Sequence, residues 1–368
     1  MDKQWNKAKL GDYIEINPKE ILKKGTISKK ISMDKLQPFC KDVPDYELTE
    51  FTGGAKFRNG DTIMARITPC LENGKTAMVN VLDKDEIGFG STEYIVFRSK
   101  TGLTDEQFVY YLVCSPIVRE PAIKSMVGSS GRQRVQTDVV SNLEINFPPL
   151  DAQRNIGNIL KAIDDKITLN KMINENLQQQ AQAIYSSMFL SDVDPSWQQG
   201  RLSDLITVKY GKDHKKLEDG NYPVYGSGGI MRHVERPLYD KESVLIPRKG
   251  TLNNVMYVNE PFWSVDTMFY TEMKLPNVAK YVYHFVKAKD LASMNAGSAV
   301  PSMTTDILNA MEIVIPSASA LDRFETLVSP MYRAMKENND QSTKLAELRD
   351  AILPKLMSGV IDLTDIQF

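Results

Sequence analysis

Cysteine and histidine are scarce in this chain of 368 residues, which holds three of each. The cysteines are odd in number and form no C-x-x-C pair, which predicts neither a disulfide framework nor a zinc site and favours a reducing compartment. The histidines do not have the spacing of metal ligands. These six residues are Cys40, Cys70, Cys114, His214, His233 and His284.

Long apolar runs are absent as well. No stretch approaches the ~20 apolar residues that a membrane helix needs, and the start, MDKQWNKAKLGDY, lacks the apolar region of a secretory signal. We therefore expect a cytoplasmic protein. Its net charge of −2 is not the basic balance of a DNA-binding protein acting alone. Clustered charge matters more than the sum, so this observation does not exclude DNA binding.

Motifs of catalysis are also missing. NFPPL at 146–150 departs from the Asn-Pro-Pro-aromatic loop of adenine methyltransferases, because Phe147 interrupts it. GSGG at 226–229 lacks the spacing of a dinucleotide fingerprint and has no Walker lysine. PDYE at 44–47 resembles the start of a metal-dependent nuclease motif, but no Glu-x-Lys follows at a useful distance. We predict a chain with no catalytic residue, no metal site and no cofactor of its own.

What the sequence does contain is an internal repeat. QTDVVSNLEINFPPL, from Gln136, returns as TTDILNAMEIVIPSA from Thr304, at an offset of 306 − 138 = 168 residues. Looser matches precede it: WNKAKLGDYIEI resembles WQQGRLSDLITV, and DTIMARITP resembles SVLIPRKGT, which places Arg66 opposite Arg248. A repeat of this length predicts two similar domains. Their unequal lengths indicate variable loops on a common framework.

After each repeated strand, apolar residues recur at alternating intervals of four and three, the spacing of a coiled-coil seam. Both seams turn polar at the middle, where a buried Asn sets the register of helix pairing. We predict two long helices that pair with each other; the alternative is two amphipathic helices on separate cores. Pro330 and Pro354 should bend or disturb the second helix. The seam residues are Ile156, Leu160, Ile163, Ile167, Asn170, Leu177, Ile184, Phe324, Val328, Met331, Met335, Asn338, Leu345 and Ile352.

The remaining sequence predicts an α+β fold with two β-rich mixed domains in tandem. Short β-branched runs lie between Gly, Asn and Pro, and each half carries one amphipathic helix before its returning strand. The strands are expected at 61–67, 93–99, 243–248, 254–258, Leu143–Phe147 and Met311–Ile315, and the helices at 105–116 and 278–288. The predicted boundaries are 1–150 and 191–318 for the domains, 151–190 and 319–358 for the long helices, and 359–368 for a tail.

Several segments together have the pattern of a known family. They are LRDAILPKLMSGVIDL (Leu348–Leu363), INFPPLDAQRNIGNILKAIDDKI, YPVYGSGGI, IPRKGT and AIYSSMFLSDVDPSW. These segments resemble type I restriction–modification specificity subunits. The similarity extends over essentially the whole chain, although the motifs of the first domain match less well, with IMARITPC where the second domain has LIPRKGT.

The resemblance implies a non-catalytic reader of double-stranded DNA. Each of two target-recognition domains would read one half of a split, asymmetric sequence. The long helices would pack antiparallel, set the spacer and dock two methyltransferase subunits, and a restriction–translocase subunit would complete the complex. S-adenosylmethionine, ATP and Mg²⁺ would belong to those partners. The alternative is a scaffold that binds no DNA and carries two ligand-binding domains on a coiled-coil stalk.

Loop residues of the second domain are candidates for DNA contact, with an ordinary solvated loop as the alternative. Lysines suit phosphates, and glycines let the backbone approach DNA closely. Arginine pairs with guanine and asparagine with adenine in the major groove. The candidates are Lys209, Tyr210, Lys212, His214, Lys215, Lys216, Tyr225, Gly226, Ser227, Gly228, Gly229, Arg248, Lys249, Gly250, Thr251, Asn253, Asn254, Asn295 and Ser298.

In the first domain the repeat places Arg66 and Thr68 opposite Arg248 and Gly250. GSSGRQR lies ahead of the returning strand and combines flexible residues with base-reading donors, and Lys75 is a weaker candidate for a phosphate contact. A plain surface turn is again the alternative. The candidates are Arg66, Thr68, Lys75, Ser129, Ser130, Arg132, Gln133 and Arg134.

Overall fold

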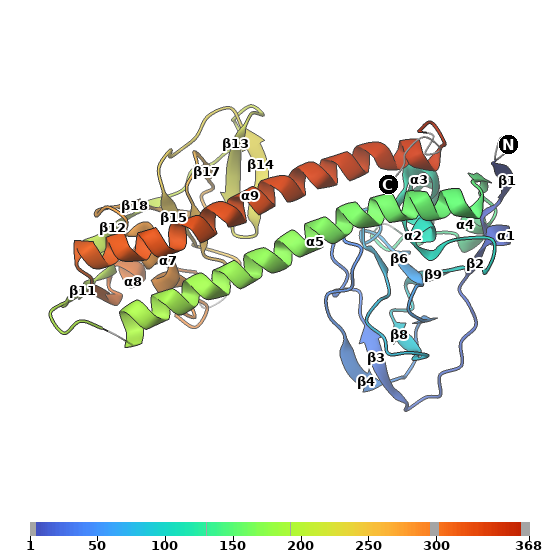
Figure 1. The fold of residues 1–368 in the computed structure, drawn as a ribbon, viewed down its shortest axis with the longest axis horizontal. Helices are drawn as coiled ribbons and strands as arrows, with labels where there is room; N and C mark the ends of the chain where they lie inside the picture. Colours follow the sequence, from blue (N-terminus) through green and yellow to red (C-terminus); the bar gives the residue numbers. More distant parts are fainter. Residues whose placement is uncertain (1–4, 130, 192, 295–301, 362–368) are drawn as a thin grey trace. The chain divides into compact units, whose positions relative to one another are not determined.

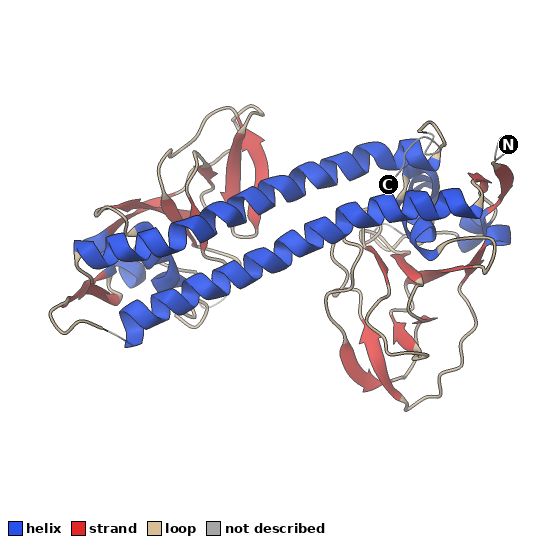
Figure 2. Cartoon of the chain, in the orientation of Figure 1, coloured by secondary structure: helices blue, strands red, loops and turns tan. Residues whose placement is uncertain are grey.

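The computed structural model describes residues 5–129, 131–191, 193–294 and 302–361. The chain divides into two compact units, one formed by Met1–Lys171 with Asn339–Phe368 and the other by Met172–Asn338. Two long helices, α5 (Leu150–Ser186) and α9 (Ala318–Met357), each contribute residues to both units (Figure 1). Each unit therefore combines a β-rich domain with parts of both helices (Figure 2).

The first unit contains two four-stranded sheets and a short pair of strands. One sheet is antiparallel, in the order β2 (Ile14–Ile16), β9 (Tyr94–Ser99), β6 (Thr62–Ala65) and β7 (Thr76–Met78). The other runs β4 (Glu47–Glu50), β3 (Ile27–Ile31), β8 (Gly88–Gly90) and β5 (Lys56–Phe57). The strand pair is β1 (Asn6–Lys9) with β10 (Glu144–Phe147), and the short helices are α1 (Leu10–Tyr13), α2 (Glu106–Cys114), α3 (Pro116–Lys124) and α4 (Thr137–Ser141).

The second unit has the same plan. Its antiparallel sheet runs β12 (Ile206–Tyr210), β18 (Met268–Met273), β15 (Ser243–Pro247) and β16 (Met256–Val258). A three-stranded sheet follows, with β14 (Gly229–Val234), β13 (Tyr222–Gly226) and β17 (Trp263–Ser264). The strand pair is β11 (Gln198–Arg201) with β19 (Glu312–Ile315), and the helices are α6 (Leu202–Leu205), α7 (Ala279–Lys287), α8 (Thr305–Asn309) and the π-helix η1 (Ser187–Ser191).

The predicted repeat is confirmed down to single hydrogen bonds. The N–H of Leu10 donates to the Leu143 carbonyl and that of Leu202 to the Met311 carbonyl, at 2.8 Å in both units. Both antiparallel sheets share one strand order, and the second sheets each contain a parallel pair, β3 with β8 and β13 with β17. The α+β prediction is therefore correct. The strands and short helices predicted by residue range are present, with ends shifted by at most two residues, whereas α5 ends at Ser186, four residues before the predicted end at 190.

The long helices share their cores. In the first unit Ile156 and Leu160 of α5 pack in one apolar cluster with Leu353 and Leu356 of α9. In the second unit the cluster contains Ala181 and Tyr185 of α5 with Phe324 and Val328 of α9, the opposite ends of the two helices. Both helices thus enter each core, which excludes the alternative of two helices on separate cores.

The polar middle of the predicted seam is also present, and the helices run antiparallel within each unit. In the first unit the Asn170 amide donates to Gln341 Oε1 at 2.9 Å and to Ser342 Oγ at 3.2 Å. In the second unit the Asn338 amide donates to Asn174 Oδ1 at 2.8 Å. Around these amides, Ile163, Ile167, Leu177, Met335 and Leu345 are only half-buried. Polar contacts therefore define the pairing at mid-helix, and apolar contacts dominate near the ends.

Neither proline interrupts the second long helix, and the bend expected at Pro330 stays a prediction. Pro330 and Pro354 both lie within α9, whose helical hydrogen bonding continues past each of them. Pro330 follows the first three turns, where packing of Leu321, Phe324 and Val328 in the core compensates for one missing N–H donor. Pro354 stands three residues from the helix end at Met357.

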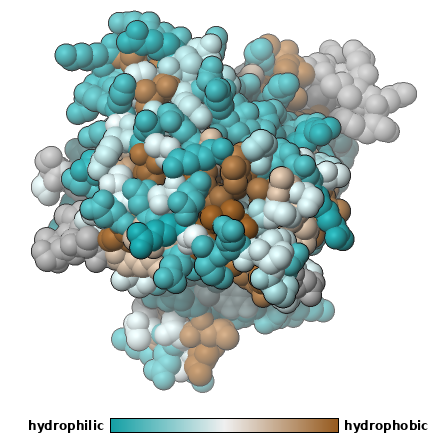
Figure 3. All heavy atoms as spheres, turned by 90° about the vertical axis from the view of Figure 1, so that its left-hand side faces the viewer, coloured by the Kyte–Doolittle hydropathy of each residue, from teal (hydrophilic) through white to brown (hydrophobic). Residues whose placement is uncertain are grey.

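The surface seen in Figure 3 is mostly hydrophilic, with brown areas where apolar side chains reach solvent. Independently of this view, Tyr210, Ile230 and Met231 are large side chains of the second unit that are exposed to solvent. No helix within the described ranges is both long enough and apolar enough to cross a membrane.

Candidate nucleic-acid interface

An arginine follows the same buried strand in both domains, and the same backbone contacts hold it. Arg66 follows β6, and its N–H donates to the Glu93 carbonyl at 2.9 Å, while its carbonyl accepts from Val135 at 2.8 Å. Arg248 follows β15, and the corresponding bonds run to the Thr267 carbonyl and from Met303, both at 2.9 Å. The pairing of Arg66 with Arg248, proposed from the repeat, is therefore a structural equivalence.

In the first domain the predicted loop GSSGRQR folds back onto the segment that follows Arg66. Thr68 N–H donates to the Gln133 carbonyl at 3.0 Å, and Ile67 forms a β-bridge with Arg134. Two segments that are more than sixty residues apart in sequence thus present side chains on one surface. Ser129 and Arg132 are exposed there, and Gln133 is half-buried.

The arginines of this surface surround one carboxylate, which the sequence analysis did not single out. Arg134 Nη2 lies 2.7 Å from Glu93 Oε1, and its Nε lies 3.0 Å from both oxygens. Arg66 Nε lies 3.9 Å from Glu93 Oε2. The Arg134 guanidinium holds the pKa of Glu93 below its usual range, so the carboxyl stays ionised. Glu93 lies just before β9 and outside the segments that match between the two repeats. No sequence pattern therefore identified it as a site residue.

The second domain orients its arginine by an aromatic ring instead. The guanidinium carbon of Arg248 lies 5.3 Å from the centroid of Tyr210, which is 52% exposed. This geometry is a cation–π contact, and Arg248 also donates to the Asp266 carbonyl at 3.2 Å. Tyr210 and Arg248, predicted from separate motifs, are therefore brought together.

Two predicted loops of the second domain also meet. The Asn254 amide donates to the Ser227 carbonyl at 2.8 Å. A Cβ on Gly250 would lie 2.7 Å from Ser227 Oγ, and Gly250 has a φ of +85°, so a glycine suits this turn. The turn at Ser227 and Gly228, between β13 and β14, thus meets the loop that follows Arg248 after β15. Thr251 and Gly228 are exposed there.

Four predicted lysines of this domain, Lys212, Lys215, Lys216 and Lys249, are exposed. Lys209 lies 3.6 Å from Glu272 in a surface ion pair, and His214 is half-buried. An exposed lysine cluster beside an arginine suits contacts to DNA phosphates. Their role as DNA ligands stays a prediction.

Other predicted residues are engaged inside the protein. Lys75 is half-buried, and its ammonium donates to the Met33 carbonyl at 2.8 Å. The Asn253 amide donates to Asp290 at 3.0 Å and accepts from the Ala292 N–H at 3.0 Å. Tyr225 lies 3.4 Å from Glu260, and Gly226 and Gly229 belong to strands β13 and β14. These contacts favour structural roles for Lys75 and Asn253. Ser130, Asn295 and Ser298 lie outside the described residues.

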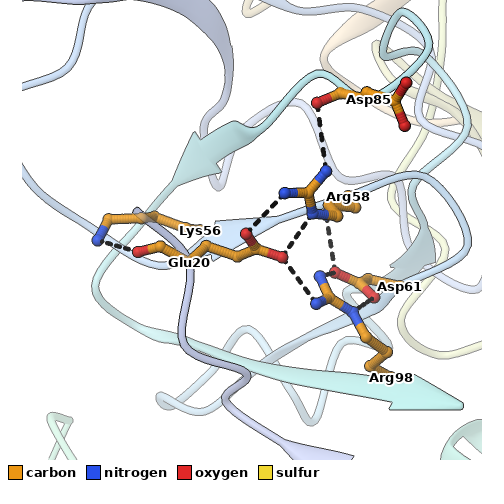
Figure 4. A network of polar contacts seen from close by, with 6 residues as sticks. All are labelled: Glu20, Lys56, Arg58, Asp61, Asp85 and Arg98. Atoms are coloured by element: carbon orange, nitrogen blue, oxygen red, sulfur yellow. Dashed lines mark hydrogen bonds and ion pairs between the residues drawn. The ribbon is translucent and has the colours of Figure 1, made fainter. Parts of the chain in front are cut away.

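A network of hydrogen bonds and ion pairs between charged side chains lies within the first domain (Figure 4). Arg98 of β9 donates to Asp61 at 2.6 and 2.7 Å and to Glu20 at 2.7 Å. Arg58 donates to Glu20 at 2.6 and 3.0 Å, and this bond, with that of Arg98, lowers the pKa of Glu20. Because the carboxylates of Asp61 and Glu20 are 2% and 7% exposed, they depend on these arginines.

A polar hydrogen bond also ties each domain's short helix to a long helix, and sequence reasoning missed both. In the first unit the Tyr111 hydroxyl donates to Asp164 of α5 at 2.6 Å, and Asp164 pairs with Arg349 of α9 at 2.7 Å. In the second unit His284 of α7 bonds Gln182 of α5 at 2.7 Å and Tyr332 of α9 at 2.9 Å.

His284 aligns with Tyr111 when the matching words QFVYYLV and KYVYHFV are superposed, so the two contacts occupy equivalent places. The helices are therefore fastened to each domain by side chains that differ between the repeats. Among the described residues no group of three or more His, Cys, Asp or Glu side chains could hold a metal ion.

These features define a class of protein: a two-domain reader whose similar frameworks carry different basic, amide and aromatic side chains on equivalent loops. The chain belongs to the family of type I restriction modification DNA specificity domains, whose model matches residues 2–179 and 195–326. The family resemblance found in the sequence is thereby confirmed.

Named relatives support this assignment over most of their length. The chain is 22% identical over 310 residues to the type I restriction enzyme MjaIX specificity subunit of Methanocaldococcus jannaschii, covering 73% of this chain and 71% of that protein. It is 22% identical over 432 residues to the HindI specificity subunit of Haemophilus influenzae, covering 87% and 89%. The S subunit of M. genitalium has a similar fold, with a TM-score of 0.61 at 17% identity and coverage of 99% and 98%.

Proposed function

We propose that this chain is the DNA-recognition subunit of a type I restriction–modification complex in which each domain reads one half of a split target. The observation that carries the proposal is the pair of equivalent arginines, Arg66 and Arg248, whose backbone hydrogen bonds are the same in both domains. The side chains around them differ: Glu93 and Arg134 in one domain, Tyr210 in the other. A shared framework gives both readers one way of approaching DNA. Different side chains on it give the two half-sites different sequences.

The long helices act as the spacer. A helix of 37 residues, such as α5, is about 55 Å long at ~1.5 Å per residue. Half-sites one turn of DNA apart need about 34–36 Å, so the helices are long enough for that task. Their antiparallel pairing, defined by the amides of Asn170, Asn174 and Asn338, fixes which segments of the two helices lie together. Helix length, rather than loop chemistry, sets the number of unread base pairs.

The chemistry belongs to partner subunits. The specificity subunit family is non-catalytic in general, and we assign adenine methylation and ATP-dependent cleavage to modification and restriction subunits of the complex. Two modification subunits dock along the helices, and S-adenosylmethionine, ATP and Mg²⁺ bind to the partners. Near-neutral charge suits a subunit that shares the phosphate contacts with them.

The test is methylation mapping of genomic DNA from cells that express this chain together with its cognate modification subunit. The expected result is adenine methylation at a sequence of two defined halves separated by unread bases, which disappears when either gene is omitted. A continuous target, or methylation that persists without this chain, would contradict the proposal.

A matched pair of substitutions assigns the halves. Arg248→Gln removes a guanine-reading or phosphate-binding side chain, and loss of such a contact costs about 1–3 kcal/mol. We expect methylation to relax at one half-site only. Arg201→Gln removes the same charge from an exposed position on β11, outside the long helices and the candidate loops, and should leave both halves unchanged.

A further inference from the structure

We propose that Glu93 is the positioning residue of the first domain: it holds Arg134 and Arg66 in one arrangement before DNA arrives and so sets which sequence that domain reads. The inference rests on the proposed function and deepens it. Glu93 itself does not touch the DNA.

The first support is geometry. Arg134 meets the Glu93 carboxylate through Nε and Nη2, with contacts of 2.7 and 3.0 Å, so both its side-chain angles and its plane are defined. Bidentate pairing of this kind gives orientation as well as energy. Arg66, 3.9 Å away, is attracted to the same carboxylate without a hydrogen bond. One acid thus orients one arginine firmly and the other loosely.

The second support is that Glu93 is itself fixed. Its own N–H donates to Ser91 Oγ at 3.1 Å, and its carbonyl accepts from Arg66 N–H at 2.9 Å. Arg134 in turn exchanges backbone hydrogen bonds with Val127 at 2.9 and 3.0 Å. The backbone is therefore held by hydrogen bonds at both Glu93 and Arg134, and the fixed carboxylate orients the arginine side chains.

The third support is that the cluster is partly exposed to solvent. The Arg66, Arg134 and Glu93 side chains are 31%, 45% and 23% exposed. The pair of Arg134 with Glu93 is the more exposed of the two, and solvent-exposed ion pairs contribute little to folding. Their benefit lies in pre-organisation, because an arginine that is already ordered loses less side-chain entropy on binding. At the equivalent place in the second domain stand Thr267 and Ser302, so the device is absent there and Tyr210 orients Arg248 instead.

The experiment measures DNA binding by the assembled complex of this chain with its modification subunits. Three labelled duplexes are compared at fixed salt: the mapped target, the target with the first domain's half scrambled, and the target with the other half scrambled. Discrimination is the ratio of dissociation constants for scrambled and intact sites. The variants are Glu93→Gln, Arg134→Lys, the double substitution, and Glu144→Gln as a control for loss of one exposed carboxylate in the same unit.

We expect Glu93→Gln to reduce discrimination at the first domain's half-site about tenfold, because two arginine side chains must then be ordered when DNA binds. Discrimination at the other half-site should not change, nor should the melting temperature. Arg134→Lys keeps the charge but loses the bidentate pair, so the double variant should be no worse than either single one. Glu144→Gln should behave as the unaltered chain does.

Three outcomes would overturn the inference: equal discrimination for Glu93→Gln and Glu144→Gln, strictly additive effects of the two substitutions, or equal losses at both half-sites. Failure of the proposed function is distinguishable from these, because the unaltered complex would then fail to discriminate the mapped half-sites at all.

Discussion

At the scale of single residues, we expect buried polar side chains to contribute more to the stability of each unit than exposed ones do. Arg98 neutralises Asp61 and Glu20, whose carboxylates are almost inaccessible. His284 is 1% exposed and lies between both long helices. Neither residue was singled out by a sequence motif, because nothing in their local pattern shows which charges will face one another after folding.

Replacing Arg98 by Met should destabilise the first unit by about 3–5 kcal/mol, because it leaves the buried Asp61 carboxylate without its arginine partner and removes one of the hydrogen bonds to Glu20. Urea denaturation of the variant should show a lower midpoint with an unchanged slope. Arg58→Met is the matched control. The Arg58 side chain is 38% exposed, Asp61 keeps both hydrogen bonds from Arg98, and Glu20 keeps one, so a much smaller loss is expected. Equal losses for the two variants would contradict this account of the network.

The stability of the second unit should depend on His284 in acid. Burial lowers the pKa of this imidazole to about 4, whereas an exposed histidine in the unfolded chain titrates near ~6.5. Between these values the unfolded chain binds a proton that the folded one does not. Stability is therefore complete above about pH 6.5 and falls as the pH drops toward 4, by at most about 3 kcal/mol.

Unfolding free energies measured from pH 7.5 to 4 would reveal this dependence. In the His284→Gln variant the histidine contribution disappears, so the difference between the variant and the unaltered chain should shrink as the pH falls. The matched control is His233→Gln, at an exposed position on β14. A pH-independent difference for His284→Gln would show that its imidazole is not buried neutral.

At the scale of elements, the long helices combine two kinds of contact. Apolar side chains near their ends, such as Leu160 and Phe324, join domain cores. Amide side chains hold their middle segments, with Asn338 bonded to Asn174 and Asn174 bonded to the Met335 carbonyl. Polar pairs in a helix seam specify register at some cost in stability.

The double substitution Asn174→Leu with Asn338→Leu should therefore keep or raise thermal stability. It should also make the pairing of α5 with α9, and the register of that pairing, less specific. We expect self-association, seen as a larger mass by light scattering after gel filtration. Each single substitution should destabilise, because it leaves an amide facing a leucine. Asn176→Leu, at an exposed site on α5, serves as the control. Purely additive effects of the two changes would show that the amides do not act as a pair.

At the scale of the whole molecule, the proposed division of labour predicts that spacer length and sequence reading can be separated. Insertion of seven residues into α5 after Lys171 and into α9 after Asn339 keeps the seam in phase and lengthens each helix by about 10 Å. Methylation mapping should show unchanged half-sites separated by roughly one to three more base pairs.

An insertion into α5 alone should instead mismatch the helices and abolish specific methylation. Altered half-sites after the paired insertion would contradict the role of the helices as a spacer. The two insertions together thus test length and pairing independently.

The sequence by itself determined the repeat, the α+β class, the positions of the main strands and the two long helices. These features depend on local periodicity and on residues such as Asp105, which caps α2 through the N–H groups of Gln107 and Phe108. The equivalence of Arg66 and Arg248 was also legible, because the framework around them is conserved between the two halves of one chain.

Only the tertiary structure decided which candidate side chains are exposed and could contact DNA, and which are already hydrogen-bonded within the protein. Lys75 and Asn253 were both candidate donors to DNA from their sequence context, but each is hydrogen-bonded within the protein. Glu93, Tyr111 and His284 gain their roles from partners 40 or more residues away. Such contacts depend on chain reversal and packing, which side-chain spacing along the sequence does not encode.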